Sequence, residues 1–172
     1  PMPAAIGDLL EHIKPHLSDP DSTLNSCLVT RYKDGEDHIP PHRDDELAFD
    51  PESEIVTVSI GAPRTMTFSN NSGSRSEELI LTDGSVLVSS RRAQDFWLHG
   101  IKKSDTDTVT RERYSFTFRH VAPHFINSTV IIGDSNTRVM NFGEGKGSFG
   151  VWMPGKRIEA FHIEDIPKPA VI

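Results

Sequence analysis

Residues 38–46, His-Ile-Pro-Pro-His-Arg-Asp-Asp-Glu, bring together side-chain types that bind metal ions. Within this stretch a single residue separates His42 from Asp44. On an extended strand, residues two apart point to the same face, so this imidazole and this carboxylate could hold one cation together. Two ligands do not complete a metal site, and an isolated His-x-Asp is commonly a surface turn. The interpretation therefore depends on a third ligand from elsewhere in the chain.

The candidate third ligand is His99, in the stretch Phe-Trp-Leu-His-Gly at residues 96–100. Two histidines and one carboxylate on one face of an octahedron form the ligand set of non-haem Fe(II) oxygenases. That set leaves three coordination positions open for a co-substrate and oxygen. The sequence therefore predicts an iron site formed by His42, Asp44 and His99.

A second informative stretch, residues 113–119, alternates polar and aromatic side chains as Arg-Tyr-Ser-Phe-Thr-Phe-Arg. Alternation with a period of two is typical of a strand, with the aromatic rings on one face and the arginines on the other. If the polar face lines the interior, Arg113 and Arg119 need buried anions, and a guanidinium fork matches carboxylates. The candidate anions are a dicarboxylate co-substrate and Asp44. The alternative is a solvent-exposed face with two ordinary arginines.

Short segments rich in β-branched and aromatic residues, separated by turns, make up the middle of the chain. The expected strands include residues 27–32, 55–60, 65–68, 78–82 and 85–89. The last two are expected to pair as a hairpin across Asp83-Gly84. Many short strands with turns every 8 to 12 residues or so indicate a sandwich or jelly roll. The predicted fold class is therefore mainly β, either a sandwich or a jelly roll.

A short amphipathic helix is expected before the strands. Its apolar stripe comprises Ile6, Leu9, Leu10, Ile13 and Leu17. Apolar residues at these spacings fall on one side of a helix, and Pro15 weakens or ends it.

Composition limits the function classes. The 172 residues carry a formal net charge of −7, so the chain is not a generally basic nucleic-acid coat. Residues 91–119 nevertheless hold seven bases against four acids, so a local basic face is compatible with an acidic whole. The single cysteine, Cys27, excludes an intramolecular disulfide and suits a reducing compartment. No apolar run approaches the length of a membrane span and no signal peptide is evident, so an intracellular protein, cytoplasmic or nuclear, is expected.

The C-terminal part differs in character. A strand is expected at residues 129–132, and it is followed by Gly-Asp-Ser and then a glycine-rich run. This resembles the first block of SGNH/GDSL hydrolases, in which Ser135 would be the nucleophile and His162 with Asp165 the other triad members. About 45 residues cannot build the α/β domain that such an enzyme needs. The segment is therefore interpreted as a fragment, a vestige or an extra β-hairpin on the main domain.

Together, the stretches resemble the AlkB family of Fe(II)/2-oxoglutarate dioxygenases that repair alkylated nucleic acid. The resemblance rests on residues 31–46, 58–64, 96–99 and 113–119, which occur in the family's order and at about its spacing. It covers roughly residues 25–121 and implies a double-stranded β-helix (jelly roll) with a short N-terminal helix. The implied organisation is a helix and linker at residues 1–24, a dioxygenase core at 25–121 and an extension at 122–172 that could be a fragment of a further domain.

The resemblance assigns roles to individual residues. It implies that His42, Asp44 and His99 bind iron. Arg113 would hold the distal carboxylate of 2-oxoglutarate with help from Tyr32, while Arg119 and Thr117 would serve the end nearer the metal. The substrate-binding residues would be Asp45 and Glu46, beside the target base. Thr30 stands where the family usually has Asn, and its single hydroxyl is expected to bind the co-substrate more weakly.

The implied activity is oxidative demethylation of N-alkylated bases of the 1-methyladenine and 3-methylcytosine type. Few residues precede the core, where family members usually carry a nucleotide-recognition lid, so single-stranded DNA or RNA is the expected substrate of an expected monomer. The residues expected to contact the phosphates of the nucleic acid are Arg91, Arg92, Lys102 and Lys103. Two alternatives stay open at this point: a dioxygenase acting on a protein or small molecule, and a non-catalytic nucleic-acid-binding module.

Overall fold

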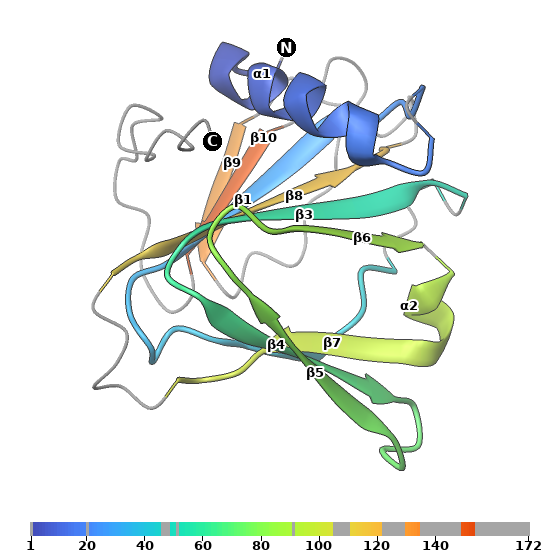
Figure 1. Ribbon diagram of the computed structural model, residues 1–172, viewed down its shortest axis with the longest axis vertical. Helices are drawn as coiled ribbons and strands as arrows, with labels where there is room; N and C mark the ends of the chain where they lie inside the picture. Colours follow the sequence, from blue (N-terminus) through green and yellow to red (C-terminus); the bar gives the residue numbers. More distant parts are fainter. Residues whose placement is uncertain are drawn as a thin grey trace.

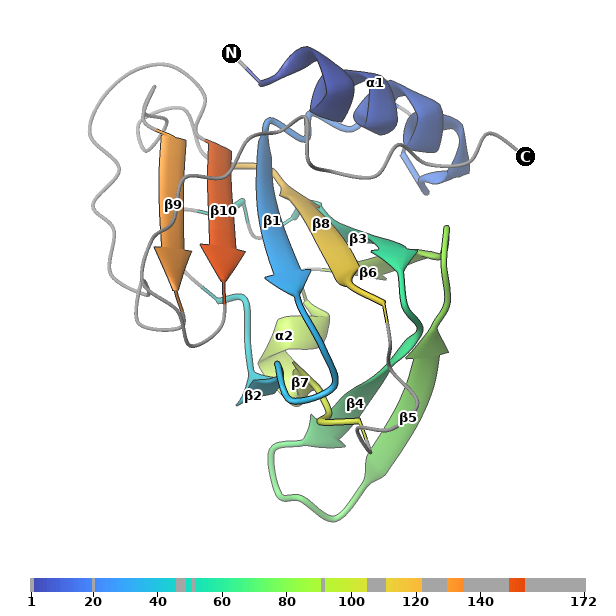
Figure 2. The ribbon, with the colours of Figure 1, turned by 90° about the vertical axis from the view of Figure 1, so that its left-hand side faces the viewer.

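The computed structural model describes residues 2–19, 21–45, 49–50, 52–90, 92–104 and 111–121, and the backbone of residues 130–134 and 149–153. The described strands form two sheets, and helix α1 lies on the outer side of the larger one (Figures 1 and 2). This arrangement confirms the mainly β, jelly-roll fold class with a short N-terminal helix.

The larger sheet has the strand order β6-β3-β8-β1-β10-β9. Its strands are β1 (Ser26–Tyr32), β3 (Glu54–Gly61), β6 (Val86–Ser90), β8 (Arg113–Arg119), β9 (Val130–Asp134) and β10 (Phe149–Met153). The smaller sheet has the order β2-β7-β4-β5. Its strands are β2 (Ile39–His42), β4 (Arg64–Asn70), β5 (Ser76–Leu81) and β7 (Trp97–Ile101). A short helix, α2 (Ala93–Phe96), leads into β7.

Helix α1 spans Ala4–Ile13 and continues as a 3-10 turn at Lys14–His16, where Pro15 interrupts the α-helical bonding pattern. All five residues of the predicted apolar stripe are buried. They share one hydrophobic cluster with Val29, Val56 and Phe118 of the larger sheet. The helix therefore belongs to the same core as the sheet, and the division of the chain at residue 24 stays a prediction.

Strand β8 has the predicted alternation. Tyr114, Phe116 and Phe118 are buried in the cluster under α1. The opposite face of the same strand, with Arg113 and Arg119, is also buried and is directed toward the smaller sheet. Because both faces of β8 are covered, the alternative of a solvent-exposed strand face is wrong. The two arginines need partners in the interior.

The predicted β5–β6 hairpin is wrong. β5 pairs with β4 and β6 pairs with β3, so residues 82–85 carry the chain from one sheet to the other. Gly84 makes this passage with a φ of +75°. The chain also changes sheets between β3 and β4, where Gly61 has a φ of +100° and a Cβ would lie 2.1 Å from the Glu112 carbonyl oxygen. Only glycine is compatible with so close a backbone approach.

The C-terminal segment contributes β9 and β10, which pair in parallel and extend the larger sheet beside β1. The predicted strand at residues 129–132 is confirmed by β9. Parallel pairing excludes a β-hairpin formed by these two strands, since a hairpin is antiparallel. Ser135, His162 and Asp165 lie outside the described residues, and the resemblance to SGNH/GDSL hydrolases stays a prediction. Within the described chain, no helix has the length and apolar character needed to cross a membrane.

Truncating Phe118 tests the shared core. Its side chain is fully buried between α1 and the larger sheet. Phe118→Ala should lower the free energy of unfolding by about 3–5 kcal/mol, because it removes apolar contacts and leaves a cavity. Phe96→Ala is the matched control, since Phe96 is 65% exposed and its loss should change stability by no more than about 0.5 kcal/mol. Urea denaturation measures both, and similar losses for the two variants would contradict this core.

Candidate metal centre and co-substrate pocket

His42 and His99 face each other across the β2–β7 strand pair. The two strands are antiparallel, and the Cα atoms of His42 and His99 are direct partners in the register. Directly opposed residues project to the same side of a sheet. The two imidazole rings accordingly lie 4.4 Å apart, centre to centre. Pro40 and Pro41 are tolerated because β2 is an edge strand of its sheet.

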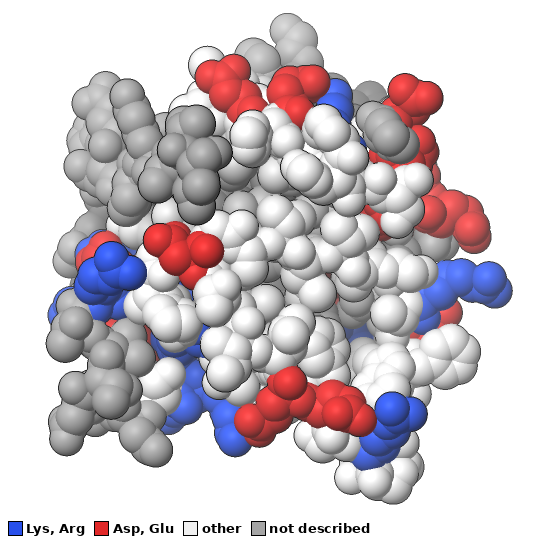
Figure 3. Space-filling model, in the orientation of Figure 1, with Lys and Arg blue, Asp and Glu red and all other residues white. Residues whose placement is uncertain are grey.

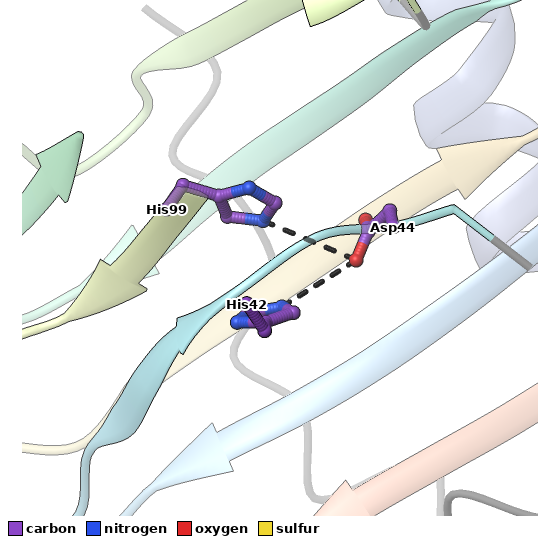
Figure 4. A group of neighbouring side chains, drawn as sticks. All are labelled: His42, Asp44 and His99. Carbon is purple, nitrogen blue, oxygen red and sulfur yellow. Dashed lines mark ion pairs between the residues drawn. The ribbon is translucent and has the colours of Figure 1, made fainter. Parts of the chain in front are cut away.

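Asp44 completes the group from the segment that follows β2. One of its oxygens, Oδ1, lies 3.4 Å from His42 Nε2 and 3.9 Å from His99 Nε2 (Figure 4). All three ligand atoms fall within 4.8 Å of one another. Metal–ligand bonds of about 2.1 Å meeting at right angles place neighbouring ligand atoms about 3 Å apart. The three side chains therefore fit one small cation after a modest contraction.

Two neighbours fix the orientation of Asp44. Arg119 donates to the second carboxylate oxygen, Oδ2, from Nε at 3.1 Å and also from Nη2. The Asp44 backbone N–H donates to Gln94 Oε1 at 3.0 Å. Burial alone would raise the pKa of Asp44, but the Arg119 guanidinium and the two histidines hold it well below its usual range. The carboxylate is therefore ionised, with Oδ2 bound to Arg119 and Oδ1 directed toward the histidines.

The histidines present the right nitrogens. His42 Nδ1 lies 3.0 Å from the Pro40 carbonyl oxygen. A carbonyl only accepts, so Nδ1 carries the hydrogen and Nε2 keeps its lone pair for a metal. Burial lowers the pKa of His99 to about 4, against the opposing effect of Asp44. His99 is thus neutral at pH 7, the form in which imidazole binds metal ions.

A second group of residues surrounds Arg113, which is 1% exposed. Its Nη2 donates to Ser59 Oγ at 3.0 Å, and a hydrogen bond with the Tyr32 hydroxyl stabilises its charge. Its Nε and Nη1 are buried without a hydrogen-bond partner, and no carboxylate of the described residues pairs with it. Burying a guanidinium without an anion is costly. The free Nε and Nη1 of Arg113 could therefore accept a carboxylate from a ligand.

The predicted co-substrate residues gather on this face. Tyr32 of β1 lies directly opposite Arg113 of β8, and Thr30 lies opposite Ser115. Directly opposed residues share a face, so Thr30 and Tyr32 lie on the same side as Arg113. Thr117 is half-buried further along the same face of β8. The guanidinium of Arg119 is bound to Asp44, one of the two anions predicted as partners, and its contact with the co-substrate stays a prediction.

The comparisons with known proteins agree with these two groups of residues. A family model described as the 2OG-Fe(II) oxygenase superfamily matches residues 1–119. The chain belongs to the 2OG-Fe(II) oxygenase superfamily. Fe(II) and 2-oxoglutarate are the cofactors of this superfamily, and the His-Asp-His group and the unpaired Arg113 fit them.

Several relatives within the superfamily are AlkB-like. DNA oxidative demethylase ALKBH2 of Homo sapiens is 36% identical over 122 residues, which cover 66% of this chain and 46% of the relative. ALKBH2 of Arabidopsis thaliana is 30% identical over 125 residues, covering 59% and 39%. The tRNA (carboxymethyluridine(34)-5-O)-methyltransferase alkbh8 of Xenopus tropicalis is 34% identical over 91 residues, covering 53% and 13%. The chain spans somewhat less than half the length of the ALKBH2 relatives it matches.

Among solved structures, one described as "The structure of OsALKBH1" matches with a TM-score of 0.40 and 20% identity, over 48% of this chain and 44% of that one.

The residues predicted to contact substrate are more dispersed. Asp45 is exposed next to Asp44, whereas Glu46 and Arg91 lie outside the described residues. Lys102 pairs with Glu78 at 2.7 Å and Lys103 with Glu36 at 3.0 Å. On the face shown in Figure 3, the coloured basic side chains lie toward the margins among acidic ones. Arg92 precedes α2 while Lys102 follows β7, so the four residues of α2 and the five of β7 separate these bases along the chain.

The contacts of two residues near the site could not be predicted from the sequence. Gln94 holds the Asp44 backbone from α2, a helix of only four residues that no periodicity could reveal. Arg64 lies in the stretch 58–64 that matches the AlkB family, but its sequence position alone indicates no partner. The structure places its guanidinium carbon 5.4 Å from the centre of the Tyr32 ring.

Removing one histidine tests the metal centre. His42→Ala should weaken Mn(II) binding by more than the roughly 10–100-fold that loss of an outer partner costs, because a direct ligand is lost. His38→Ala is the control, since His38 lies on the same segment but outside the cluster. Mn(II) titration followed by electron paramagnetic resonance counts the free ion directly. Equal affinity in the His42 variant and the wild type would rule out this ligand set.

Proposed function

We propose that this protein is an Fe(II)/2-oxoglutarate-dependent dioxygenase that demethylates N-alkylated bases in nucleic acid. One observation carries the proposal: the His-Asp-His group and the unpaired, buried Arg113 lie between the same two sheets. A cation site and a carboxylate site so placed suit a metal and its dicarboxylate co-substrate. Nucleic acid is supported by the relatives named DNA oxidative demethylase, which are 30–37% identical over the matched residues.

When bound, Fe(II) and 2-oxoglutarate would use oxygen to oxidise an N-methyl group to a hydroxymethyl group, which is then lost as formaldehyde. In this proposal His42, Asp44 and His99 would hold the metal, and these three ligands would leave room for a co-substrate. Arg113 and Tyr32 bind the distal carboxylate of the co-substrate, with Thr30 beside them.

The proposed role of Arg119 differs from that of Arg113. Its bonds engage Asp44 Oδ2, so that Oδ1 would be the carboxylate oxygen that holds the metal. Thr117 lies on the same face of β8, between the two arginines, and is proposed to contact the co-substrate near the metal. The chain thus uses one buried arginine for the co-substrate and the other for a metal ligand.

The substrate part of the proposal rests on charge. A base such as 1-methyladenine or 3-methylcytosine is cationic at neutral pH, whereas the unmethylated base is neutral. Asp45 is exposed beside Asp44 and would attract that positive charge. Glu46 is proposed to act with it. A target base must leave its stack to reach a metal between two sheets, and extrusion costs least from a single strand.

We extend the proposal to a monomer that acts inside the cell, in the cytoplasm or nucleus. The lone Cys27 is buried and its pKa is raised by burial, so the thiol stays protonated and unreactive. This is compatible with a reducing compartment.

The co-substrate pocket is tested by two neighbouring arginines. Arg113→Ala should weaken 2-oxoglutarate binding about 10- to 150-fold, because a hydrogen bond to a buried charged group contributes about 1.5–3 kcal/mol. Arg111→Ala should have little effect, since Arg111 is exposed just before β8. Isothermal titration of the Mn(II)-loaded protein with 2-oxoglutarate gives both affinities. Equal losses in the two variants would show that the carboxylate binds elsewhere.

The activity itself is tested with matched oligonucleotides, DNA and RNA, carrying 1-methyladenine or 3-methylcytosine. The expected result is formaldehyde release and a loss of about 14 mass units from the base, faster in single strands than in duplex and slower as salt rises. Succinate formed without any oligonucleotide provides the baseline. Faster repair of a fully paired duplex would contradict the strand preference. Brisk conversion of another substrate class with no demethylation would contradict the nucleic-acid proposal.

A further inference from the structure

Arg64, the first residue of β4, is buried to 1% exposure and forms no ion pair with any described residue. Its guanidinium instead donates to four backbone carbonyl oxygens. Three belong to the loop between β1 and β2: Asp34 at 3.0 Å, Gly35 at 3.3 Å and Asp37 at 2.6 Å. The fourth is Lys102, just beyond β7, at 2.7 Å. One side chain therefore ties this loop to the end of β7.

The segments that Arg64 joins lead directly to the site. The β1–β2 loop begins after Tyr32, which lies opposite Arg113, and ends at the strand that carries His42. Lys102 follows the strand that carries His99. Hydrogen bonds from one rigid, planar guanidinium therefore fix the spacing between a co-substrate residue and the metal-bearing strands.

Arg64 also lies against the Tyr32 ring. The central guanidinium carbon of Arg64 is 5.4 Å from the ring centre, and that of Arg113 is 4.8 Å from it. Both distances fall within the range of cation–π attraction. Tyr32 is 2% exposed, and it also packs with Met66, Leu81 and Ile101 in a second hydrophobic cluster. Burial raises the pKa of Tyr32, so the hydroxyl keeps its proton and can donate it in a hydrogen bond to a carboxylate.

A contribution to stability alone does not explain why a buried guanidinium occupies the position of Arg64. Burying a guanidinium that has no anion costs several kcal/mol, and an apolar side chain could fill the same volume without that cost. The Nε of Arg64 is in addition buried without a partner. What a guanidinium provides here, and an apolar residue does not, is several donors in fixed directions and a positive charge beside Tyr32.

We propose that Arg64 is a positioning residue for the 2-oxoglutarate pocket, which holds the Tyr32 hydroxyl beside Arg113 by tying the β1–β2 loop to the end of β7. This inference rests on the proposed function, since it assigns a residue to the same pocket. Arg64 acts through Tyr32, without touching the co-substrate. Its loss should therefore matter for co-substrate affinity only while the Tyr32 hydroxyl is present.

A double-mutant cycle tests this dependence. The variants are Arg64→Lys, Tyr32→Phe and the two combined, each loaded with Mn(II) and titrated calorimetrically with 2-oxoglutarate. Tyr32→Phe should weaken 2-oxoglutarate binding on the order of tenfold, the cost of one hydrogen bond to a charged group. Arg64→Lys keeps the charge but loses the planar fork, and should cause a loss of similar size. The affinity of the double variant for 2-oxoglutarate should be no lower than that of the single variant with the lower affinity, because both substitutions act through one hydroxyl. Mn(II) affinity should not change.

Arg31→Lys is the matched control. Arg31 lies on the same strand as Tyr32, but it is bound to Glu112 and makes no contact with the Tyr32 ring among the described interactions. It should leave 2-oxoglutarate affinity unchanged. If Arg64→Lys fails to fold, Gly35→Val serves as a second variant. It disturbs the contact between the β1–β2 loop and the end of β7, because a Cβ on Gly35 would lie 3.0 Å from the Ser104 carbonyl oxygen. That variant should also weaken 2-oxoglutarate binding, and should do so only with Tyr32 in place.

Three results would overturn the inference. One is an unchanged 2-oxoglutarate affinity with a lowered unfolding temperature, which would show a structural role alone. The second is losses that multiply in the double variant, which would show that Arg64 does not act through Tyr32. The third is a parallel fall in Mn(II) affinity, which would show a general disruption of the site. If the wild-type protein loaded with Mn(II) binds no 2-oxoglutarate, the proposed function fails and the role of Arg64 fails with it.

Discussion

The buried ion pair between Arg119 and Asp44 is the contact on which the site depends. It joins β8 of the larger sheet to the segment after β2 of the smaller one, so it holds the two sheets together where the metal ligands meet. It also ionises Asp44 and reserves one carboxylate oxygen for a cation. Removing only the carboxylate would leave Arg119 as an uncompensated buried charge, which typically costs 3–5 kcal/mol or so. In this fold, metal binding and stability therefore share a residue.

The interior is unevenly charged around that pair. Of the residues that the structure describes, three arginines are buried, Arg64, Arg113 and Arg119, while Asp44 is the one buried acid. The backbone carbonyls around Arg64 and the hydroxyls around Arg113 offset part of this positive charge but supply no anion. A dicarboxylate brings two negative charges to this region. A ligand that binds only the folded chain stabilises it, so the co-substrate is expected to act as a structural component as well as a reactant.

Sequence reasoning predicted what depends on local pattern. The period of two in β8 placed Arg113 on the polar face, and the spacing of His42 and Asp44 put both on one side of an extended segment. It could not predict strand partners, because Asp83-Gly84 is equally suited to a hairpin and to a passage between sheets. It also gave no role to Gln94 or Arg64, whose partners are backbone atoms from distant segments that only the folded chain brings close. The ion pairs of the surface lysines could not be predicted either, because their partners are also distant in sequence.

The sheet order has a consequence for how the protein folds. The strands that face each other in the site are far apart in sequence, and the Arg119–Asp44 contact closes a separation of 75 residues. Contacts of such high sequence separation form late and slow the folding rate, because the entropy of closing long loops is lost before any contact compensates it. Neither half of the chain contains a complete ligand set, since His42 lies on β2 and Asp44 just after it, whereas His99 lies on β7. A nascent or partly folded chain therefore lacks the assembled three-ligand group, which forms only in the completed jelly roll.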